Sequence, residues 1–303
     1  MENSWVRNRW IIALGLLFCL VAWWTPALAQ EAAAPAAAPE AKPAEAPAED
    51  RPTASLGVDV LSQYIWRGFA LSRNSAVVQP SLTVGYKGFA VNIWGNFDTG
   101  ENNPFLSPSF RGAKWNETDF TVGYSRDLYN GTAIKAITAN IGAIYYAFDS
   151  AINPQGDSFE IYYGLGIDVN WFKLSATANQ EVFHYPGWWL TLGISRVFEL
   201  PFKIQENNNL TLELGHNFIF LFSRDQVAYP DPTTSDPTLA FSGPLAGQFY
   251  ATLSVPVHKY VTIAPKIGFW YAAGGSATPL LAGASWDNQQ NHIYGGVNAT
   301  FAY

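Results

Sequence analysis

A few charged side chains occupy the polar face of segments in which apolar and polar residues alternate, and their types could do chemistry. Strand direction and side-chain parity bring six of them toward one mouth of a common interior: Arg67, Asp98, Glu117, Asp119, Glu160 and Glu181. Carboxylates crowded in a narrow, partly desolvated ring concentrate cations and repel anions. The sequence therefore predicts a weakly cation-preferring constriction in which Arg67 pairs with one or more acids. The alternative is a structural network of ion pairs that pins strands together.

Four further inward positions complete the candidate site. Asp59 and Lys266 share the inward parity and are candidates for lining the same lumen. Trp94 and Trp270 also point inward and could stack on a sugar or nucleoside, although such rings more often fill space.

Catalytic and metal readings find little support in the chain. His184 lies near Glu181, and His292 follows Ser285 and Asp287, but no nucleophile motif or metal-ligand spacing surrounds them. The segment from Asp231 to Asp236 lacks the glycine and the terminal acid of a calcium loop. We therefore expect no enzyme activity, no catalytic residue, no metal and no cofactor.

Composition limits the kind of surface that can carry these residues. The 303 residues are 49% hydrophobic and only 14% charged, with a net charge of -7 and a mean hydropathy of zero. Soluble proteins carry about 25% charge, and helical membrane proteins are clearly hydrophobic on average. A wall that is apolar on one side and polar on the other fits better. No region is basic, so nucleic acid is not an expected partner.

The first 53 residues differ from the rest. Arg7 and Arg9 precede an apolar run that ends before Ala27-Leu28-Ala29, so residues 1–29 are predicted to be a secretory signal peptide rather than a membrane anchor. The only cysteine, Cys19, lies inside this segment. Residues 30–53 are almost all Ala, Pro and Glu, which predicts a disordered periplasmic tail that acts as a spacer, a tether or a plug.

From residue 54 onward the hydrophobic pattern has a period of two. Between Phe159 and Trp171, apolar and polar or small residues alternate without interruption, which places one class on each face of a strand. We predict twelve such strands, at about 54–68, 76–87, 89–98, 117–128, 133–148, 158–171, 173–184, 188–199, 210–222, 247–257, 260–272 and 291–303.

The connections between these segments alternate in length. Short ones such as Lys87-Gly88 and His258-Lys259 alternate with long ones such as 99–116, 223–246 and 273–290. An even strand number with short turns on one side and long loops on the other is typical of a bacterial outer-membrane barrel. The predicted fold is an all-β, antiparallel, up-and-down transmembrane β-barrel over residues 54–303, with both ends in the periplasm.

The outward face of these strands suits a lipid bilayer. It carries Val58, Leu82, Val91 and Leu165, almost without charge. Aromatic residues fall near the ends of the strands on this face, where barrels place their aromatic girdles: Tyr64, Trp66, Tyr86, Phe89, Tyr124, Tyr145, Phe159, Trp171, Trp188, Tyr271 and Tyr303. The outer-membrane bilayer is thus an expected partner.

The last strand ends in aromatic residues. Val297, Ala299, Phe301 and Tyr303 share one face. Phe301 and Tyr303 resemble the terminal signal that outer-membrane barrels present to the barrel-assembly machinery, which we expect as a partner.

The segment Leu61–Gly100 also resembles a known family. The segment is similar to the start of the TorF-like family of outer-membrane porins, which are twelve-stranded barrel channels. The similar residues are Ser62-x-Tyr64-x-x-Arg67-Gly68, Gln79-Pro80, Tyr86, Gly88-Phe89 and Trp94. The segment from Glu117 to Tyr124 resembles the fourth strand of that family. The resemblance implies a passive pore and names no solute.

These observations predict a channel for passive diffusion of small polar solutes or cations through a narrow lumen, in the envelope of a Gram-negative cell. Twelve strands lie between filled eight-stranded barrels and open sixteen-stranded porins. Two alternatives stay open: a structural or adhesion barrel with a closed lumen, and a solute-specific uptake channel.

Overall fold

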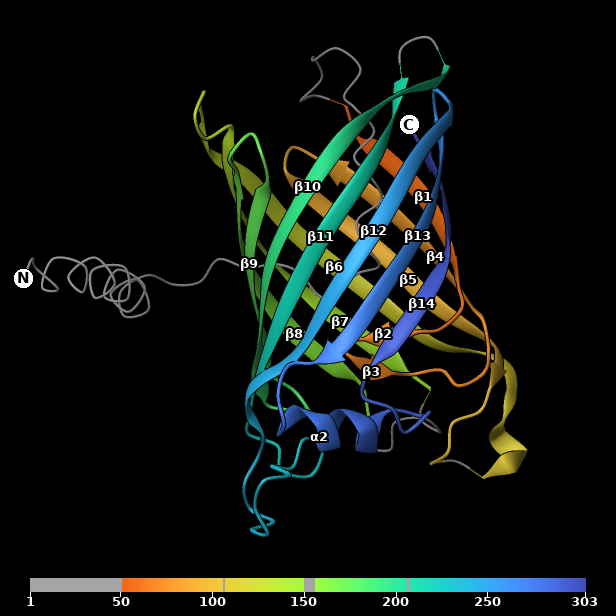
Figure 1. Ribbon diagram of the computed structural model, residues 1–303, viewed down its shortest axis with the longest axis vertical. Helices are drawn as coiled ribbons and strands as arrows, with labels where there is room; N and C mark the ends of the chain where they lie inside the picture. The colour runs from red at the N-terminus through yellow and green to blue at the C-terminus, as the bar shows by residue number, and fades with distance from the viewer. Residues whose placement is uncertain (1–50, 106, 150–155, 206–207) are drawn as a thin grey trace, which may run out of the picture.

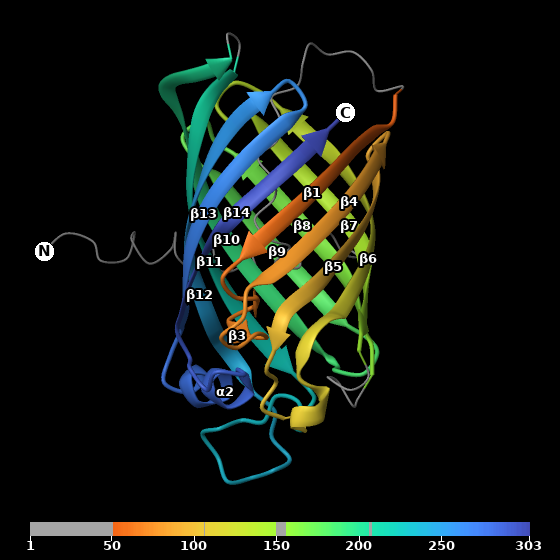
Figure 2. The same ribbon diagram turned by 90° about the vertical axis from the view of Figure 1, so that its right-hand side faces the viewer.

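The described part of the chain forms one closed antiparallel β-barrel (Figures 1 and 2). The computed structural model describes residues 51–105, 107–149, 156–205 and 208–303. The predicted signal peptide, residues 1–29, and most of the predicted tail, residues 30–53, lie outside the described residues. The predicted fold class is confirmed.

The barrel wall contains twelve strands, each paired with its neighbour along the chain. They are β1 (Thr53–Leu61), β4 (Val77–Tyr86), β5 (Phe89–Glu101), β6 (Gly112–Asn130), β7 (Ala136–Phe148), β8 (Ser158–Asp168), β9 (Lys173–Glu181), β10 (Gly187–Gln205), β11 (Asn208–Ser223), β12 (Ser242–His258), β13 (Val261–Ala272) and β14 (His292–Ala302). The pairing of β1 with β14, from Leu61↔Gly296 to Ser55↔Ala302, closes the wall. Every wall strand therefore has two partners and no edge is left open.

The two ends of the barrel differ in their connections. At one end of the barrel the connections are short, β1 begins and β14 ends; we call this the turn end. We call the opposite end the loop end (Figure 1). At the turn end, Lys87 and Gly88 both have positive φ angles and join β4 to β5 as a two-residue hairpin. That conformation matches the twist of the flanking strands. The loop end carries the 3-10 helix η1 (Pro108–Phe110) and the helix α2 (Ala277–Ala284).

Alternation separates an apolar outer face from a polar inner one. The outer belt includes Val91, Val122 and Ile267, whose side chains are about half exposed, as suits a barrel surrounded by lipid. On the inner face, the Tyr162 ring lies against Gly142 and Gly123, where any Cβ would collide with it. Glycine thus lets a large inward ring lie flat on the wall.

Strand ends differ from the sequence prediction where the backbone turns. The predicted strand 158–171 ends at Asp168, because Asn170 adopts a positive φ of 67° in the turn that follows. In contrast, β10 continues to Gln205 through Pro201, and its pairing with β11 shifts register between Glu199 and Lys203. A bulge accommodates the proline, which has no N–H to donate to the ladder.

The main correction concerns the predicted strand 54–68. The wall strand β1 ends at Leu61, and the chain then folds into the barrel as a hairpin of β2 (Ile65–Trp66) and β3 (Phe69–Ala70), seen inside the lower wall in Figure 1. Arg67 and Gly68, both with positive φ, form its turn. Tyr64 and Trp66 therefore lie inside the barrel, so their predicted place in the outer aromatic girdle is wrong.

The hairpin and α2 build an apolar core at the loop end, where Figure 2 shows both beside the mouth. The backbone N–H of Trp286 donates to Ala70 O at 2.9 Å, and the Ala70 N–H donates to Ser285 Oγ at 3.1 Å, so the last loop is tied to β3. The buried members of this core are Phe69, Trp189, Ile219, Leu221, Phe241, Leu245, Ala246, Trp270, Ala277, Leu280 and Leu281.

Within the described ranges, none of the helices has the length and apolar character required to cross a membrane.

Candidate functional site

Arg67 lies at the tip of the β2–β3 hairpin, inside the loop end of the barrel. Its Nη1 and Nη2 atoms contact the two carboxylate oxygens of Glu160, on β8, at 2.6 and 2.7 Å. Its guanidinium lies 4.5 Å from the ring centroid of Trp66 and 4.6 Å from that of Trp189. Burial lowers the pKa of Arg67, but the charges of Glu160 and Tyr146 and the hydrogen bonds to Glu160 together outweigh it, so the pKa is raised. The predicted pairing of Arg67 with an acid is confirmed.

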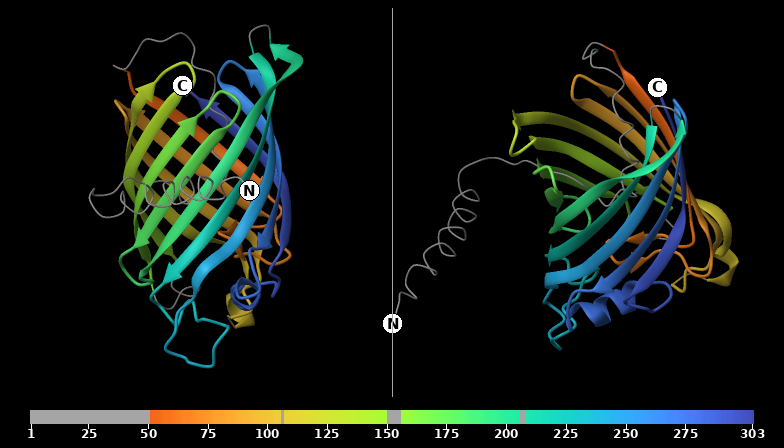
Figure 3. Two further views of the ribbon diagram at one scale, coloured as in Figure 1. Left: turned by 60° about the vertical axis from the view of Figure 1, so that its left-hand side comes forward. Right: turned by 45° about the horizontal axis from the view of Figure 1, so that its top comes forward.

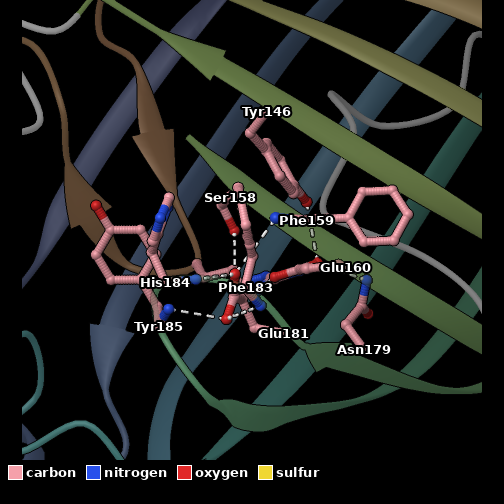
Figure 4. Close-up of polar contacts among 10 residues, drawn as sticks. Tyr146, Ser158, Phe159, Glu160, Asn179, Glu181, Phe183, His184 and Tyr185 are labelled. Atoms are coloured by element: carbon pink, nitrogen blue, oxygen red, sulfur yellow. Dashed lines mark hydrogen bonds and ion pairs between the residues drawn. The ribbon is translucent and has the colours of Figure 1, made fainter. Parts of the chain in front are cut away.

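Glu160 accepts hydrogen bonds from three side chains. In addition to Arg67, it accepts a hydrogen bond from the Tyr146 hydroxyl at 3.0 Å and one from Asn179 Nδ2 at 2.9 Å (Figure 4). Arg67 and Glu160 are each 1% exposed. A charge pair this deeply buried is tolerated because its geometry is bidentate and neutral donors supply further hydrogen bonds to the carboxylate. The pair therefore ties the hairpin to the wall and presents little free charge to a solute.

Glu181 has a different role from the one its parity alone suggests. Its oxygens accept hydrogen bonds from the Ser158 hydroxyl and from the backbone N–H groups of Phe159, Phe183, His184 and Tyr185 (Figure 4). These donors include the backbone of the short connection from β9 to β10. The carboxylate thus stabilises that connection as a multiple backbone acceptor.

Glu117 and Asp119 lie on the same inward face of β6, two residues apart. In the described chain, no lysine, arginine or histidine forms an ion pair with either carboxylate. Tyr64 lies against this pair: burial raises its pKa, and the negative charges of Glu117 and Asp119 raise it further. Oδ1 of Asp119 is buried without a hydrogen-bond partner among the described atoms. These two carboxyl groups therefore have, among the described residues, neither a basic partner nor the backbone N–H donors that surround Glu181.

Asp98 lies beside a polar network and opposite Lys114 in the pairing of β5 with β6. Its Oδ1 accepts the Gly100 N–H at 2.9 Å, whereas its Oδ2 is buried without a partner in the described structure. Nearby, Asn96 donates to Asn116 at 2.7 Å, and Asn116 donates to Glu101 at 2.9 Å. Lys114 pairs with Glu101 at 2.6 Å. Side-chain parity did not predict three of these residues as site residues, because Glu101, Lys114 and Asn116 lie in the predicted loop 99–116.

Asp59 and Lys266 meet deeper in the barrel, as an ion pair of 2.6 Å. Asn298 Nδ2 donates to the other oxygen of Asp59 at 3.0 Å. Both charged residues face inward, as their parity indicates, and they neutralise each other. Whether they line a path for solutes stays a prediction.

The two candidate stacking rings are largely covered by other side chains. Trp94 faces Tyr64 with ring centroids 5.6 Å apart, and Trp270 is buried in the loop-end core with Phe69. Their predicted contact with a ligand stays a prediction. Phe301 and Tyr303 lie at the turn end, with ring centroids 5.9 and 5.8 Å from that of Tyr260. Their role as an assembly signal is likewise untested.

A cavity of about 210 Å³ lies between the hairpin and the wall. Aromatic rings dominate its lining, and three carboxylates join them. The lining residues are Tyr64, Trp66, Phe69, Leu71, Asn116, Glu117, Tyr146, Phe148, Ser158, Glu160, Glu181, Tyr185, Trp189, Tyr229, Ala284 and Trp286. Parity alone could have found Tyr146 and Trp189, whereas Tyr229 and Trp286 come from long loops that carry no such signal.

The turn end of the lumen is more open to water. On β4 to β7, inward polar side chains there are half-buried, whereas Ser254 on β12 and Asn298 on β14 are buried; the half-buried ones include Thr83, Asn92, Thr121, Thr138 and Asn140. Asn92 Nδ2 donates to Ser81 Oγ and Thr83 Oγ1, each at 2.8 Å. The inner face is thus polar at both ends, but only the loop end is filled with packed side chains.

The candidate catalytic histidines do not assemble a hydrolase site among the described residues. His292 contacts Asp287 at 3.2 Å, but its Nε2 has no hydrogen-bond partner in the described structure, and Ser285 instead accepts the N–H of Ala70. The described residues also contain no group of three or more His, Cys, Asp or Glu side chains placed to hold a metal. Absence of enzyme activity stays a prediction.

The chain belongs to the family described as "Bacterial protein of unknown function (Gcw_chp)", whose model matches residues 45–226, more than half of its length. No curated protein matches it.

Solved structures similar to this chain include other barrels. The KdgM porin is 10% identical with a TM-score of 0.45, the match covering 82% of this chain and 99% of the porin. The NanC porin is 11% identical with a TM-score of 0.48, covering 81% and 98%. Outer membrane phospholipase A from Escherichia coli is 13% identical with a TM-score of 0.40, covering 82% and 92%. Similarity of this degree, to porins and to an enzyme alike, carries no argument about substrate or activity.

Proposed function

We propose that this protein is an outer-membrane channel through which small polar solutes diffuse passively, with a narrow lumen that weakly prefers cations. The observation that carries the proposal is the combination of a closed twelve-stranded wall, an exposed apolar outer belt and a polar lumen accessible to water at the turn end. A wall of this kind suits hydrocarbon outside and water inside. The resemblance to the TorF-like porins supports the same function.

The charge of the mouth supports a preference for cations. Arg67 and Lys266 are each neutralised by a buried acid, whereas Glu117 and Asp119 have no ion-pair partner among the described side chains. Net negative charge in a constricted, low-dielectric passage raises the local concentration of cations. The short connections and both wall ends share one side, which fits a periplasmic turn end with the tail beside it. Phe301 and Tyr303 would then present the assembly signal from that side.

Planar-bilayer conductance tests the proposal directly. The purified protein is reconstituted, and the reversal potential is measured in a gradient of KCl. We expect small current steps and a reversal potential on the cation-selective side. A variant in which residues 65–70 are replaced by a short glycine-serine linker should conduct more, because the hairpin occupies the mouth. Absence of current from both proteins, or selectivity for anions, would overturn the channel proposal.

A second function has support of its own. The loop-end core joins the hairpin, α2 and the wall in one packed unit, which favours a structural or adhesion barrel with a closed lumen. Liposome swelling with sugars, amino acids and nucleosides of graded size separates the possibilities. Size-dependent swelling supports a general pore, one preferred solute supports a specific uptake channel, and no swelling supports the closed barrel.

A further inference from the structure

The loop-end cavity combines aromatic rings with an acid that has no internal counter-ion. Nine of its sixteen lining residues are aromatic, and three are glutamates. Two of those carboxylates are already occupied: Glu160 by Arg67, Tyr146 and Asn179, and Glu181 by Ser158 and backbone N–H groups. Glu117 differs from both, since in the described structure it has neither a basic partner nor backbone N–H donors, and Tyr64 hydrogen-bonds to it. It is nevertheless only 5% exposed.

Aromatic residues surround Glu117 on the wall and on the hairpin. Phe148 is its cross-strand partner on β7, and the Phe148 and Tyr146 rings stack with an interplanar angle of 9°. Tyr64 approaches from the hairpin side and hydrogen-bonds to Glu117; burial and then the charge of Glu117 raise the pKa of Tyr64. A carboxylate removed from water without a cation is costly, so a buried carboxyl favours its neutral form until a cation pairs with it. A bound cation would both remove that cost and gain from the ring faces.

The protein already holds a cation in this way a short distance along the same cavity. Arg67 places its guanidinium over Trp66 and Trp189 and pairs with Glu160, so aromatic faces and one carboxylate surround the charge. The surroundings of Glu117 repeat this chemistry with Tyr64, Tyr146 and Phe148, but the described chain supplies no cation there. A ligand that binds beside Glu117 must therefore carry the positive charge itself.

The remaining polar groups of the lining argue against a neutral sugar. Asn116 accepts from Asn96 and donates to Glu101, and Ser158 donates to Glu181. Asn116 and Ser158 already form hydrogen bonds within the protein, whereas the hydroxyl groups of a sugar require several donors and acceptors that are still available. One carboxylate among rings suits a small molecule with a single charged nitrogen and an apolar body.

From this geometry we propose that the loop-end cavity binds a small organic monocation with an ammonium group, held by Glu117 and by the rings of Tyr64, Tyr146 and Phe148. This inference deepens the proposed function because it names the class of solute that the mouth selects. It does not require that the barrel conduct, since binding at the mouth can be measured without transport.

Choline chloride is the probe, and 3,3-dimethyl-1-butanol, which has carbon in place of the charged nitrogen, is its neutral control. Both are titrated into the full-length mature protein in detergent micelles, with tryptophan fluorescence and calorimetry as readouts. We expect saturable choline binding, at least about tenfold tighter than that of the neutral alcohol, because only the cation gains the charge and ring contacts. Sodium chloride at equal ionic strength controls for screening.

Two substitutions identify the site. Glu117→Gln keeps the shape of the side chain and removes its charge, and should weaken choline binding at least about tenfold. Asp127→Asn makes the same change on the same strand at the turn end, where Asp127 accepts from Thr138, and should leave binding within about twofold. Phe148→Leu keeps every charge and should weaken binding severalfold. Heat-modifiable mobility on gels verifies that each variant is folded.

The outcomes separate this inference from the channel proposal. Saturable binding that depends on Glu117, in a barrel that passes no current, supports the inference and overturns the channel. Current without choline binding supports the channel and overturns the cation site. Equal affinity for choline and its neutral analogue, or unchanged binding by Glu117→Gln, overturns the cation site.

Discussion

The two ends of the lumen have the same inward polarity but different contents. At the loop end, the β2–β3 hairpin and α2 fill the space, so that Arg67 and Glu160 are almost completely buried. At the turn end, inward residues such as Asn92 and Thr121 are half-buried and accessible to water. Figure 3 shows the barrel in two further views, with α2 beside the loop-end mouth. Alternation along the strands sets which side chains point inward, whereas the connections decide whether protein or water meets them.

The largest expected effect comes from removing the charge pair at the loop end. Arg67→Ala leaves Glu160 buried with only neutral donors, and breaking a buried pair on one side costs about 3–5 kcal/mol. We expect the free energy of unfolding, measured in urea by tryptophan fluorescence in micelles, to fall by this amount. Under the proposed function, conductance should rise as the hairpin leaves the mouth.

A double variant controls for the loss of charge itself. Arg67→Met with Glu160→Gln removes both charges and leaves no buried ion, so most of the lost stability should return. An Arg67→Ala protein that unfolds at the same urea concentration as the natural one would show that the hairpin is not held by this pair.

The second prediction concerns the apolar part of the same end. Leu281 on α2 is fully buried and packs near Gly68, where a Cβ would lie 3.2 Å from Leu281 Cδ2. Leu281→Ala should cost about 2–4 kcal/mol in the same unfolding measurement, from lost burial and the cavity left behind. Leu239→Ala, in an exposed part of a long loop, should stay within about 0.5 kcal/mol. Equal effects of the two substitutions would mean that α2 does not form part of a packed core.

Cysteine labelling tests the difference in water access directly. The single cysteine, Cys19, lies in the predicted signal peptide, so introduced cysteines should report without background from the mature chain. Thr121→Cys at the turn end should react with a water-soluble methanethiosulfonate reagent at least about tenfold faster than Ala246→Cys in the loop-end core, because the core must open locally first. Equal labelling rates of the two cysteines in the folded protein would show that water reaches both ends of the lumen equally.

The wall could be predicted from the sequence because its signal is local and repeated. Period-two alternation places Glu160, Trp94 and Lys266 inward without knowledge of any partner. The same rule failed at Tyr64 and Trp66, because strands of an inner hairpin alternate as wall strands do. The Arg67-Gly68 pair is the sequence feature that could have indicated a turn here, since a residue followed by glycine suits a two-residue hairpin turn.

The arrangement of the candidate site depends on contacts that the pattern does not contain. Arg67 and Glu160 are 93 positions apart, and parity shows only that opposite charges face the same mouth. The function of Glu181 as an acceptor for four backbone N–H groups depends on a tight connection whose conformation no side-chain pattern specifies. Tyr229 and Trp286 reach the cavity from loops, where no period applies.

The smallest predicted effect compares two asparagines on one strand. Asn96 and Asn92 both point inward from β5, but Asn96 is fully buried between Gln79 and Asn116, whereas Asn92 bonds Ser81 and Thr83 where water can enter. Asn96→Ala deprives the buried amides of Gln79 and Asn116 of one hydrogen-bond partner each and should lower the free energy of unfolding by about 1–3 kcal/mol. Asn92→Ala should lower it by about 1 kcal/mol or less, because water replaces the lost amide. The measurement is the free energy of unfolding of each variant in micelles. The two asparagines share their residue type, their strand and their inward direction, so a difference between the two losses of stability reports whether protein or water fills the lumen at each position. Equal losses would mean that water reaches both side chains.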